Sequence, residues 1–170
     1  FAATSGQGVY VLKDDTFEKV KFVKGSNVNT MENVGDQIFI STNLENIIYD
    51  GNNTSFMGKG FPNEKIVDVF SNNANTYFAS DQSLIKLDGN KYISEKITFP
   101  SSSAKIQALL IDDDIEYFGT NQGLWSRQNN SNVKLITNIN VLSLDKASNG
   151  SIIVGAKKGF YYLDNGALKK

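Results

Sequence analysis

Pairs of small residues recur at an almost constant interval along the chain. Each pair closes an apolar or aromatic run and precedes a short polar turn, after which a second apolar run begins. The pairs are Ala3-Thr4, Ser41-Thr42, Ala79-Ser80, Gly119-Thr120 and Gly155-Ala156. Successive pairs lie 38, 38, 40 and 36 residues apart. A period of about 40 residues that is built from strands indicates a radial or solenoidal repeat, and the blades of a β-propeller are the first candidate.

Each repeat is predicted to form one four-stranded antiparallel blade. In the third repeat, apolar runs at 66–70, 76–79 and 84–87 precede a more polar run at 91–98. Strands that are buried on both faces read as nearly continuous apolar runs, whereas a strand at the outer rim is mixed. We therefore expect the second and third strands to be buried and the fourth to lie at the rim. No segment is predicted to form a helix, so the fold class is all-β.

The small residues have a packing reason. Where neighbouring blades press together, only Gly, Ala, Ser or Thr leaves space for a neighbouring aromatic side chain such as Trp125 or Tyr161. The first member of each pair should therefore occupy the same position in successive blades. These residues are Ala3, Ser41, Ala79, Gly119 and Gly155.

Asp-Gly dipeptides between apolar runs predict tight hairpins. They occur at Asp50-Gly51 and Asp88-Gly89, and Asp164-Asn165-Gly166 is a related turn. A two-residue loop of type I′ needs a positive φ at both central residues, which is why Asp-Gly favours it. We expect type I′ turns at these places.

The repeat runs through the whole chain, and we expect one propeller segment of about five blades' worth of strands. Residues 1–23 supply three strands but no first strand, and residues 139–170 supply three strands and a short fourth. An unclosed sheet edge is a liability, so we expect the segment to belong to a larger propeller. A self-contained five-bladed ring that lacks one strand is the alternative. The approximate repeats are 1–25, 26–63, 64–101, 102–138 and 139–170.

The composition excludes several kinds of site. None of the 170 residues is Cys or His, which removes disulfides, thiolate or imidazole metal sites, and Ser-His-Asp or Cys-His catalysis. The net charge is −1 and no basic stripe is present, so nucleic acid is not an expected partner. No apolar stretch approaches the roughly 20 residues of a membrane-spanning helix. No cofactor is expected.

One acidic cluster could suggest a metal site. Asp112-Asp113-Asp114 and Glu116 carry the oxygen ligands that Ca²⁺ or Mg²⁺ prefers. Their position between the first and second strands of the fourth repeat favours a solvated turn, and no metal site is predicted.

The turns between the second and third strands are the expected binding surface. In a propeller these turns and the blade-to-blade connections lie on one face, and loops on rigid scaffolds carry function. The turns differ in charge between repeats, which suits an asymmetric ligand or a protein partner. The candidate binding residues are Asn43, Glu45, Asp81, Gln82, Asn121, Gln122, Lys157 and Lys158.

The fourth repeat resembles the two-component regulator propeller repeat. That signature is an aromatic or aliphatic run, then Gly-Thr, two variable residues, Gly-Leu and an aromatic residue. Residues 117–125 read Tyr-Phe-Gly-Thr-Asn-Gln-Gly-Leu-Trp, and residues 154–161 are similar with Ala in place of Thr. The first two repeats carry one inserted residue, and the third has Ser83 in place of Gly.

This resemblance implies a propeller of typically six to eight blades in an exported protein of Bacteroidetes-type bacteria, often the periplasmic sensor region of a hybrid two-component system. It implies an extracytoplasmic module of a sensor or surface-assembly protein that binds a small ligand, a glycan or a protein on one face. It implies no catalytic residues.

The alternative function is a propeller enzyme, a glycan hydrolase or lyase, whose site lies on the channel axis. Such an enzyme needs convergent carboxylates or a metal ion there. First-strand residues point toward that axis, and Glu32 and Asp68 are the acidic ones. The first-strand candidates are Asn29, Glu32, Asp68, Gln107 and Ser143.

Overall fold

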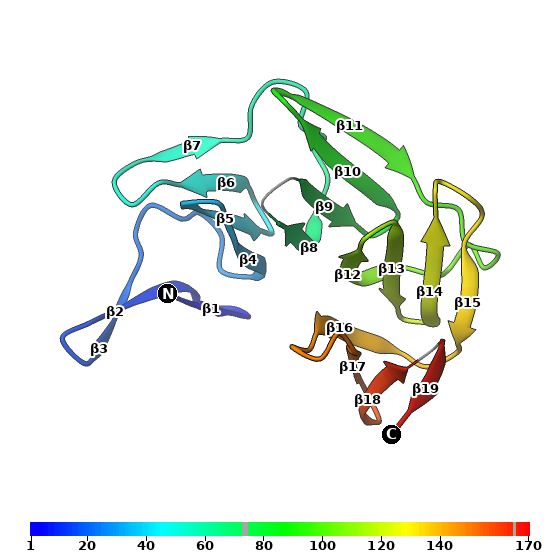
Figure 1. Ribbon diagram of the computed structural model, residues 1–170. Helices are drawn as coiled ribbons and strands as arrows, with labels where there is room; N and C mark the ends of the chain where they lie inside the picture. Colours follow the sequence, from blue (N-terminus) through cyan, green and yellow to red (C-terminus); the bar gives the residue numbers. More distant parts are fainter. Residues whose placement is uncertain (73–74, 165) are drawn as a thin grey trace. The chain divides into compact units, whose positions relative to one another are not determined.

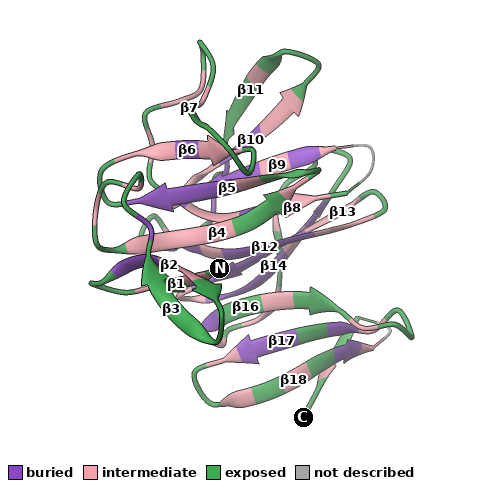
Figure 2. Ribbon diagram, turned by 90° about the vertical axis from the view of Figure 1, so that its left-hand side faces the viewer, coloured by how far each residue is buried: buried purple, intermediate pink, exposed green. Residues whose placement is uncertain are grey.

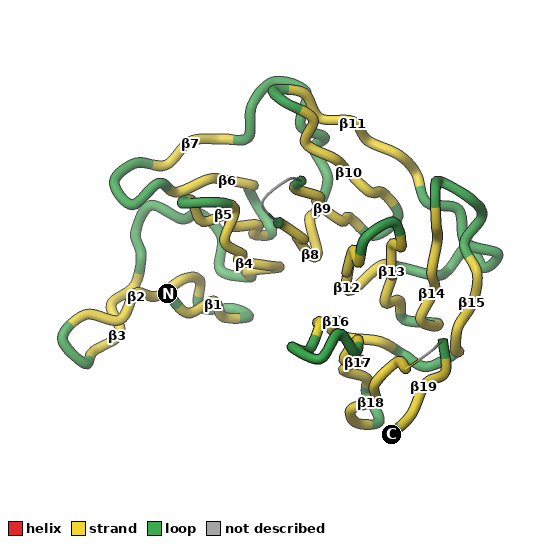
Figure 3. Tube along the Cα trace, in the orientation of Figure 1, coloured by secondary structure: helices red, strands yellow, loops and turns green. Residues whose placement is uncertain are grey.

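The computed structural model describes residues 1–72, 75–164 and 166–170. Over these residues the chain forms strands, turns and bends without a helix (Figure 3). The predicted all-β class is therefore confirmed. Asn165 lies outside the described residues, so the turn expected at Asp164-Asn165-Gly166 is not described.

The strands form five antiparallel sheets in which each strand pairs with its neighbours in the chain (Figure 1). The first sheet has three strands and each of the others has four. The first is β1 (Ala2–Thr4), β2 (Gly8–Lys13) and β3 (Thr16–Lys19); the second is β4 (Val28–Val34), β5 (Gln37–Thr42), β6 (Asn46–Tyr49) and β7 (Thr54–Phe56); the third is β8 (Ile66–Ser71), β9 (Thr76–Ser80), β10 (Ser83–Asp88) and β11 (Lys91–Lys96); the fourth is β12 (Ile106–Asp112), β13 (Ile115–Thr120), β14 (Gly123–Gln128) and β15 (Lys134–Thr137); the fifth is β16 (Val141–Lys146), β17 (Ile152–Ala156), β18 (Gly159–Asp164) and β19 (Ala167–Lys169).

The chain divides into two compact units. The first unit comprises residues 1–78 and 85–94, and the second comprises residues 79–84 and 95–170. The first therefore holds the first two sheets and part of the third, and the second holds the remainder of the third sheet and the last two.

Burial of the second and fourth strands follows the predicted grading, whereas the third strands β6 and β18 are only partly buried. The second strands β5, β9 and β13 end in runs of buried residues. The fourth strands β7 and β11 are almost wholly exposed. This difference matches strands that are covered on both faces at the inside of a sheet and solvated at its rim.

The first residues of the small pairs occupy equivalent register positions. Ser41 pairs with Thr30 and Asn46, Gly119 with Ala108 and Leu124, and Gly155 with Ser143 and Phe160. In all three sheets the neighbouring first strand has a register shift just before this pair. The predicted equivalence is therefore confirmed for Ser41, Gly119 and Gly155.

The hydroxyl of the second residue in a pair closes the turn that follows. Thr120 Oγ1 donates to the Gly123 carbonyl at 2.9 Å and accepts the Gln122 N–H at 3.1 Å. Thr4 Oγ1 donates to the Gly8 carbonyl at 2.7 Å. Thr42 Oγ1 accepts the Leu44 and Glu45 N–H groups, both at 3.1 Å. A short hydroxyl side chain thus replaces the backbone partners that a tight turn leaves unpaired.

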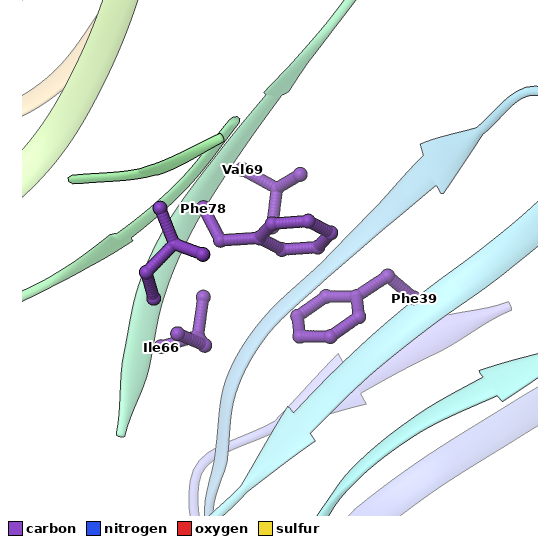
Figure 4. Close-up of a cluster of buried hydrophobic side chains, with 5 residues drawn as sticks. Phe39, Ile66, Val69 and Phe78 are labelled. Carbon is purple, nitrogen blue, oxygen red and sulfur yellow. The ribbon is translucent and has the colours of Figure 1, made fainter. Parts of the chain in front are cut away.

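Aromatic packing builds the core of the first unit. Phe39 of β5 lies against Phe78 of β9 with ring centroids 5.0 Å apart, and Ile66 and Val69 of β8 with Ile85 of β10 complete the cluster (Figure 4). A second cluster joins Val9 of the first sheet to Ile40 and Ile47 of the second.

The core of the second unit contains a group of aromatic rings and a buried cluster of ion pairs. The Phe99 ring lies 6.1 Å from that of Phe118 and 5.5 Å from that of Trp125. Arg127 of β14, with its side chain 5% exposed, donates to Glu116 at 2.5 Å and to both oxygens of Glu95 at 2.6 and 3.0 Å. The two carboxylates raise the pKa of Arg127 against the opposing effect of desolvation, which is the largest single influence.

The predicted hairpins form, but the prediction of type I′ turns is wrong. Positive φ angles occur at Gly51 (96°) and Gly89 (57°) and not at the preceding Asp residues. A positive φ at the first central residue alone suits type II′ rather than type I′. The reason is that Asp50 stays outside the turn centre and accepts the N–H groups of Asn53 at 2.6 Å and Asn52 at 2.9 Å, bonds that lower the pKa of Asp50.

The first prediction concerns the close contact at Gly119. A Cβ atom at this position would lie 2.5 Å from Val141 Cγ1 and 3.2 Å from Ala108 Cβ. Because both neighbours are buried, Gly119→Ala should lower the free energy of unfolding by about 1–3 kcal/mol through overpacking. Chemical denaturation measures this loss, and adding Val141→Ala should recover part of it.

Gly58→Ala is the matched control. The nearest atom to a Cβ at Gly58 is Tyr92 Cε2, at an ordinary contact distance of 3.9 Å. Equal losses in the Gly58 and Gly119 variants would contradict the packing explanation.

The second prediction concerns Arg127. Arg127→Met keeps the apolar stem and leaves Glu116, whose side chain is 16% exposed, without its counter-ion. We expect a loss of about 3 kcal/mol in the free energy of unfolding, because an uncompensated buried charge is costly. Glu18→Gln, which breaks the exposed Lys13–Glu18 pair, should change stability very little. Equal effects in the two variants would refute a structural role for the buried cluster.

Candidate functional site

A polar hollow of about 650 Å³ opens in the first unit. We call it the amide pocket, because five of its lining residues are asparagines. Its walls come from the β1–β2 and β5–β6 turns, the start of β4 with the residue before it, and the connection that precedes β8. The lining residues are Ser5, Asn27, Val28, Asn29, Thr42, Asn43, Leu44, Glu45, Asn46, Asn63, Glu64 and Lys65.

Several polar groups of the amide pocket are fixed by the protein itself. Asn43 Oδ1 accepts the Asn27 N–H at 3.2 Å, and the Asn43 N–H donates to the Asn27 carbonyl at 3.0 Å. Asn29 Nδ2 donates to the Thr42 carbonyl at 2.8 Å. Glu45 Oε1 accepts the Lys24 N–H at 2.6 Å. These bonds hold the turn and the chain segment before β4 together, so the pocket is formed before any ligand arrives.

The Asn46 side chain has one hydrogen-bond acceptor that no described residue uses. Its Nδ2 donates to the Glu64 carbonyl at 3.0 Å, while its Oδ1 is buried and accepts no hydrogen bond from the described residues. A buried acceptor without a donor is costly. Because this oxygen is closed off from solvent, a ligand hydroxyl or N–H group would reach it only after the Asn46 side chain turned toward the pocket.

The predicted turn residues fall into three groups. Asn43 and Glu45 line the amide pocket. In the second unit the other four turn residues of β9–β10 and β13–β14 surround the connection at 101–105. Asp81 pairs with Lys105 at 2.8 Å, Gln82 Nε2 donates to the Ser102 carbonyl at 3.4 Å, Asn121 Oδ1 accepts the Lys105 N–H at 2.8 Å, and Gln122 Nε2 donates to Ser103 Oγ at 2.6 Å.

The third group lies on the β17–β18 turn. Lys157 and Lys158 are exposed there, and the Lys157 N–H donates to the Asn140 carbonyl at 3.2 Å. A binding role for any of the eight residues stays a prediction. What the structure adds is that the side chains of Asn43, Glu45, Asp81, Gln82, Asn121 and Gln122 all bond to their own chain.

Only two of the twelve residues that line the amide pocket, Asn43 and Glu45, are among the predicted binding residues. Asn46 follows the chosen turn by one residue, and Asn27, Asn63 and Lys65 lie in blade-to-blade connections. The expectation that turns and connections share a face was the signal that could have found them. The predicted binding residues all lie in the turns.

The first-strand candidates lie on four different strands. Asn29 and Glu32 belong to β4, Asp68 to β8, Gln107 to β12 and Ser143 to β16. Partial burial raises the pKa of Glu32 above its ordinary value of 4.5. Asp68 Oδ1 accepts the N–H of Val69 at 2.9 Å.

The acidic residues between β12 and β13 take part in ion pairs and in a turn. Asp112 pairs with Lys146, and Glu116 pairs with Arg127. Asp113 occupies the turn between β12 and β13 with a φ of 51°. Across residues 1–72, 75–164 and 166–170, no three acidic side chains converge in a way that could hold a metal ion.

No family model and no curated protein matches this chain. Solved structures do match it. The extracellular domain of BT4673 from B. thetaiotaomicron, assigned to a one-component system, aligns with a TM-score of 0.76 at 20% identity over 94% of this chain. That of BT3049 from the same organism, assigned to a hybrid two-component system, aligns with a TM-score of 0.70 at 18% identity over 92% of this chain.

A third match is the WD40 β-propeller domain of Doa1, with a TM-score of 0.65 at 13% identity over 88% of this chain and 54% of that one. The chain thus has an all-β propeller fold, as predicted, and it shares this fold with the extracellular domains of BT4673 and BT3049. It spans 24% of the length of the BT4673 and BT3049 domains. Where the structure describes the chain, it has no helix that is both long and apolar enough to cross a membrane.

The third prediction concerns Glu32 and pH. A carboxyl group whose pKa is raised in the folded state is easier to bury when protonated, so its cost appears as the pH rises through the folded pKa. Glu32→Gln removes that cost. We expect the thermal midpoint of the variant to equal that of the parent below about pH 4 and to exceed it at pH 7. A lower midpoint for the variant at pH 7 would show that the Glu32 carboxylate is stabilising instead.

Proposed function

We propose that residues 1–170 form part of an extracytoplasmic propeller that binds a ligand or a protein without catalysing a reaction. The observation that carries this proposal is the amide pocket, formed in advance by turns and connections on a fold shared with sensor extracellular domains. The module serves as a sensor or as a component of a surface assembly.

The lining of the amide pocket favours a neutral ligand that is rich in hydrogen-bonding groups. Side-chain amides offer donors and acceptors together, and Asn46 Oδ1 is an acceptor left over. Glu45 and Glu64 stand beside a single cation, Lys65, so an anion gains little there. Glycan fragments and polar peptide loops have this chemistry.

The same comparison supports the proposed location. BT4673 and BT3049 present this fold in their extracellular domains, which supports an extracytoplasmic place for this chain. The resemblance of residues 117–125 to the two-component regulator propeller repeat supports it independently.

The fourth prediction tests the pocket. Neutral oligosaccharides and short polar peptides are screened by calorimetry against the folded chain. Asn46→Ala should weaken a binding probe by about tenfold, the loss expected when one buried hydrogen bond of about 1.4 kcal/mol disappears.

Asn140→Ala is the matched control, because Asn140 Oδ1 in the second unit is also buried and accepts no hydrogen bond from the described residues. Binding that is unchanged in the Asn46 variant, or lost equally in both variants, would remove the site from the amide pocket. Cleavage of an oligosaccharide probe that Glu32→Gln with Asp68→Asn abolishes would favour the enzyme instead.

A further inference from the structure

The β5–β6 turn differs in polarity from the equivalent turns of the other sheets. Leu44 stands at its centre, whereas the residues between the corresponding strands of the other sheets are polar or glycine. Those turns are residues 5–7, 81–82, 121–122 and 157–158. Leu44 is 69% exposed, although the turn follows directly on the buried end of β5 (Figure 2). The second sheet thus presents an apolar side chain where the other turns present polar ones.

The strand after this turn departs from the repeat in the opposite sense. The residue that pairs with the small residue of the preceding strand is Val9 in the first sheet, Leu124 in the fourth and Phe160 in the fifth. At this register position the second sheet has Asn46, which pairs with Ser41. Apolar and polar positions are therefore exchanged between the turn and the start of β6. Local violations of an otherwise regular pattern are expected at functional sites.

Both exchanged residues, Leu44 and Asn46, line the amide pocket. The Leu44 N–H donates to Thr42 Oγ1 at 3.1 Å. On either side of Leu44, the side chains of Asn43 and Glu45 accept backbone N–H groups of the segment before β4. These bonds fix the backbone of the turn while most of the Leu44 side chain stays in contact with solvent. A side chain presented on a preorganised backbone binds a partner at a lower entropic cost.

The lining of the amide pocket favours an aliphatic partner group over a sugar ring. The C–H face of a pyranose carries partly positive hydrogens, which are attracted to the negative face of an aromatic ring. None of the described residues that line the amide pocket is aromatic. Leu44 is aliphatic and branched, and a second aliphatic side chain against it would remove apolar surface of both from water.

A polypeptide backbone also matches the polar part of the lining. It carries one N–H donor and one C=O acceptor per residue, and a side-chain amide offers the same two groups. Five asparagines line the amide pocket. Its charged residues are the carboxylates of Glu45 and Glu64 and the ammonium group of Lys65. This balance favours a segment with neutral or basic side chains over an acidic one.

We propose that the amide pocket takes an extended polypeptide segment of a protein partner, with one aliphatic side chain seated on Leu44 and neutral or basic side chains beside it. Leu44 is then the residue that selects a polypeptide over a glycan. This assignment rests on the proposed function and narrows it from two classes of ligand to one.

Selection from a random peptide library tests the assignment. Linear nonapeptides displayed on phage are selected on the folded chain, and the selected sequences are synthesised and measured by calorimetry. We expect these sequences to share one aliphatic residue and to carry no net negative charge. Leu44→Ser removes the apolar contact but suits a turn, and it should weaken the peptides by about tenfold. Asn46→Ala should weaken them as well.

Leu12→Ser is the matched control. Leu12 of β2 belongs to the same unit, is 54% exposed and is not part of the pocket lining. This variant should bind the selected peptides like the parent chain. Leu44→Met keeps an apolar side chain of similar volume and should retain the affinity within about twofold. Equal losses in the Leu44→Ser and Leu12→Ser variants would overturn the assignment.

A double-mutant cycle tests whether the aliphatic residue of the peptide packs on Leu44. Replacing that peptide residue by Ser should cost about tenfold against the parent chain and very little against Leu44→Ser, because both changes remove the same contact. Independent losses that multiply to about a hundredfold would place the aliphatic residue elsewhere and refute the assignment.

The remaining outcomes separate the polypeptide assignment from the proposed function. Suppose that the library yields no binding peptide, while neutral oligosaccharides bind and are weakened by Asn46→Ala but not by Leu44→Ser. The polypeptide would then be refuted and the binding function would stand. If neither peptides nor oligosaccharides bind, both fail. Peptides that Leu44→Ser weakens and Asn46→Ala does not would lie outside the amide pocket, which would also overturn the assignment.

Discussion

The close approach of β16 to the small residue Gly119 of β13 is the constraint on which the packing of the second unit depends. A Cβ atom at Gly119 would meet Val141, so the next sheet can pack at this distance only over a residue without a bulky side chain. The adjacent Thr hydroxyl then closes the turn that returns the chain to the third strand. In this pair the first residue, Gly119, allows the close spacing between sheets, and the second residue, Thr120, closes the hairpin turn.

The same turn bonds shape the candidate site. They use the side chains of Asn43 and Asn121 to tie the second-to-third-strand turns to the segments before β4 and β12, respectively. The side chains of these turns are therefore occupied by bonds that hold the turns in place. Asn46 Oδ1, one residue beyond the β5–β6 turn, is buried and accepts no hydrogen bond from the described residues, and a role for it in binding is the proposal made above.

The part of the fold that could be predicted depends on the interval between repeats and on the apolar content of each strand. Burial of β5, β9 and β13 and exposure of β7 and β11 follow from apolar content alone, because each strand's surroundings repeat from sheet to sheet. Turn geometry was less predictable. Both central residues have positive φ at Asp14-Asp15, between β2 and β3, and not at the Asp-Gly dipeptides. Asx bonds such as those of Asp50 compete with the two-residue turn, and dipeptide preference does not include them.

The sequence by itself determined the class of fold, the equivalence of Ser41, Gly119 and Gly155, and the absence of His and Cys chemistry. These depend on residue identity and spacing, which are local quantities. Only the tertiary structure decided that Ser5, Asn27, Asn46 and Lys65 share one pocket and that Arg127 is buried between two carboxylates. Each of these requires segments distant in sequence to meet at a definite register. Register comes from packing between sheets, which no single repeat encodes alone.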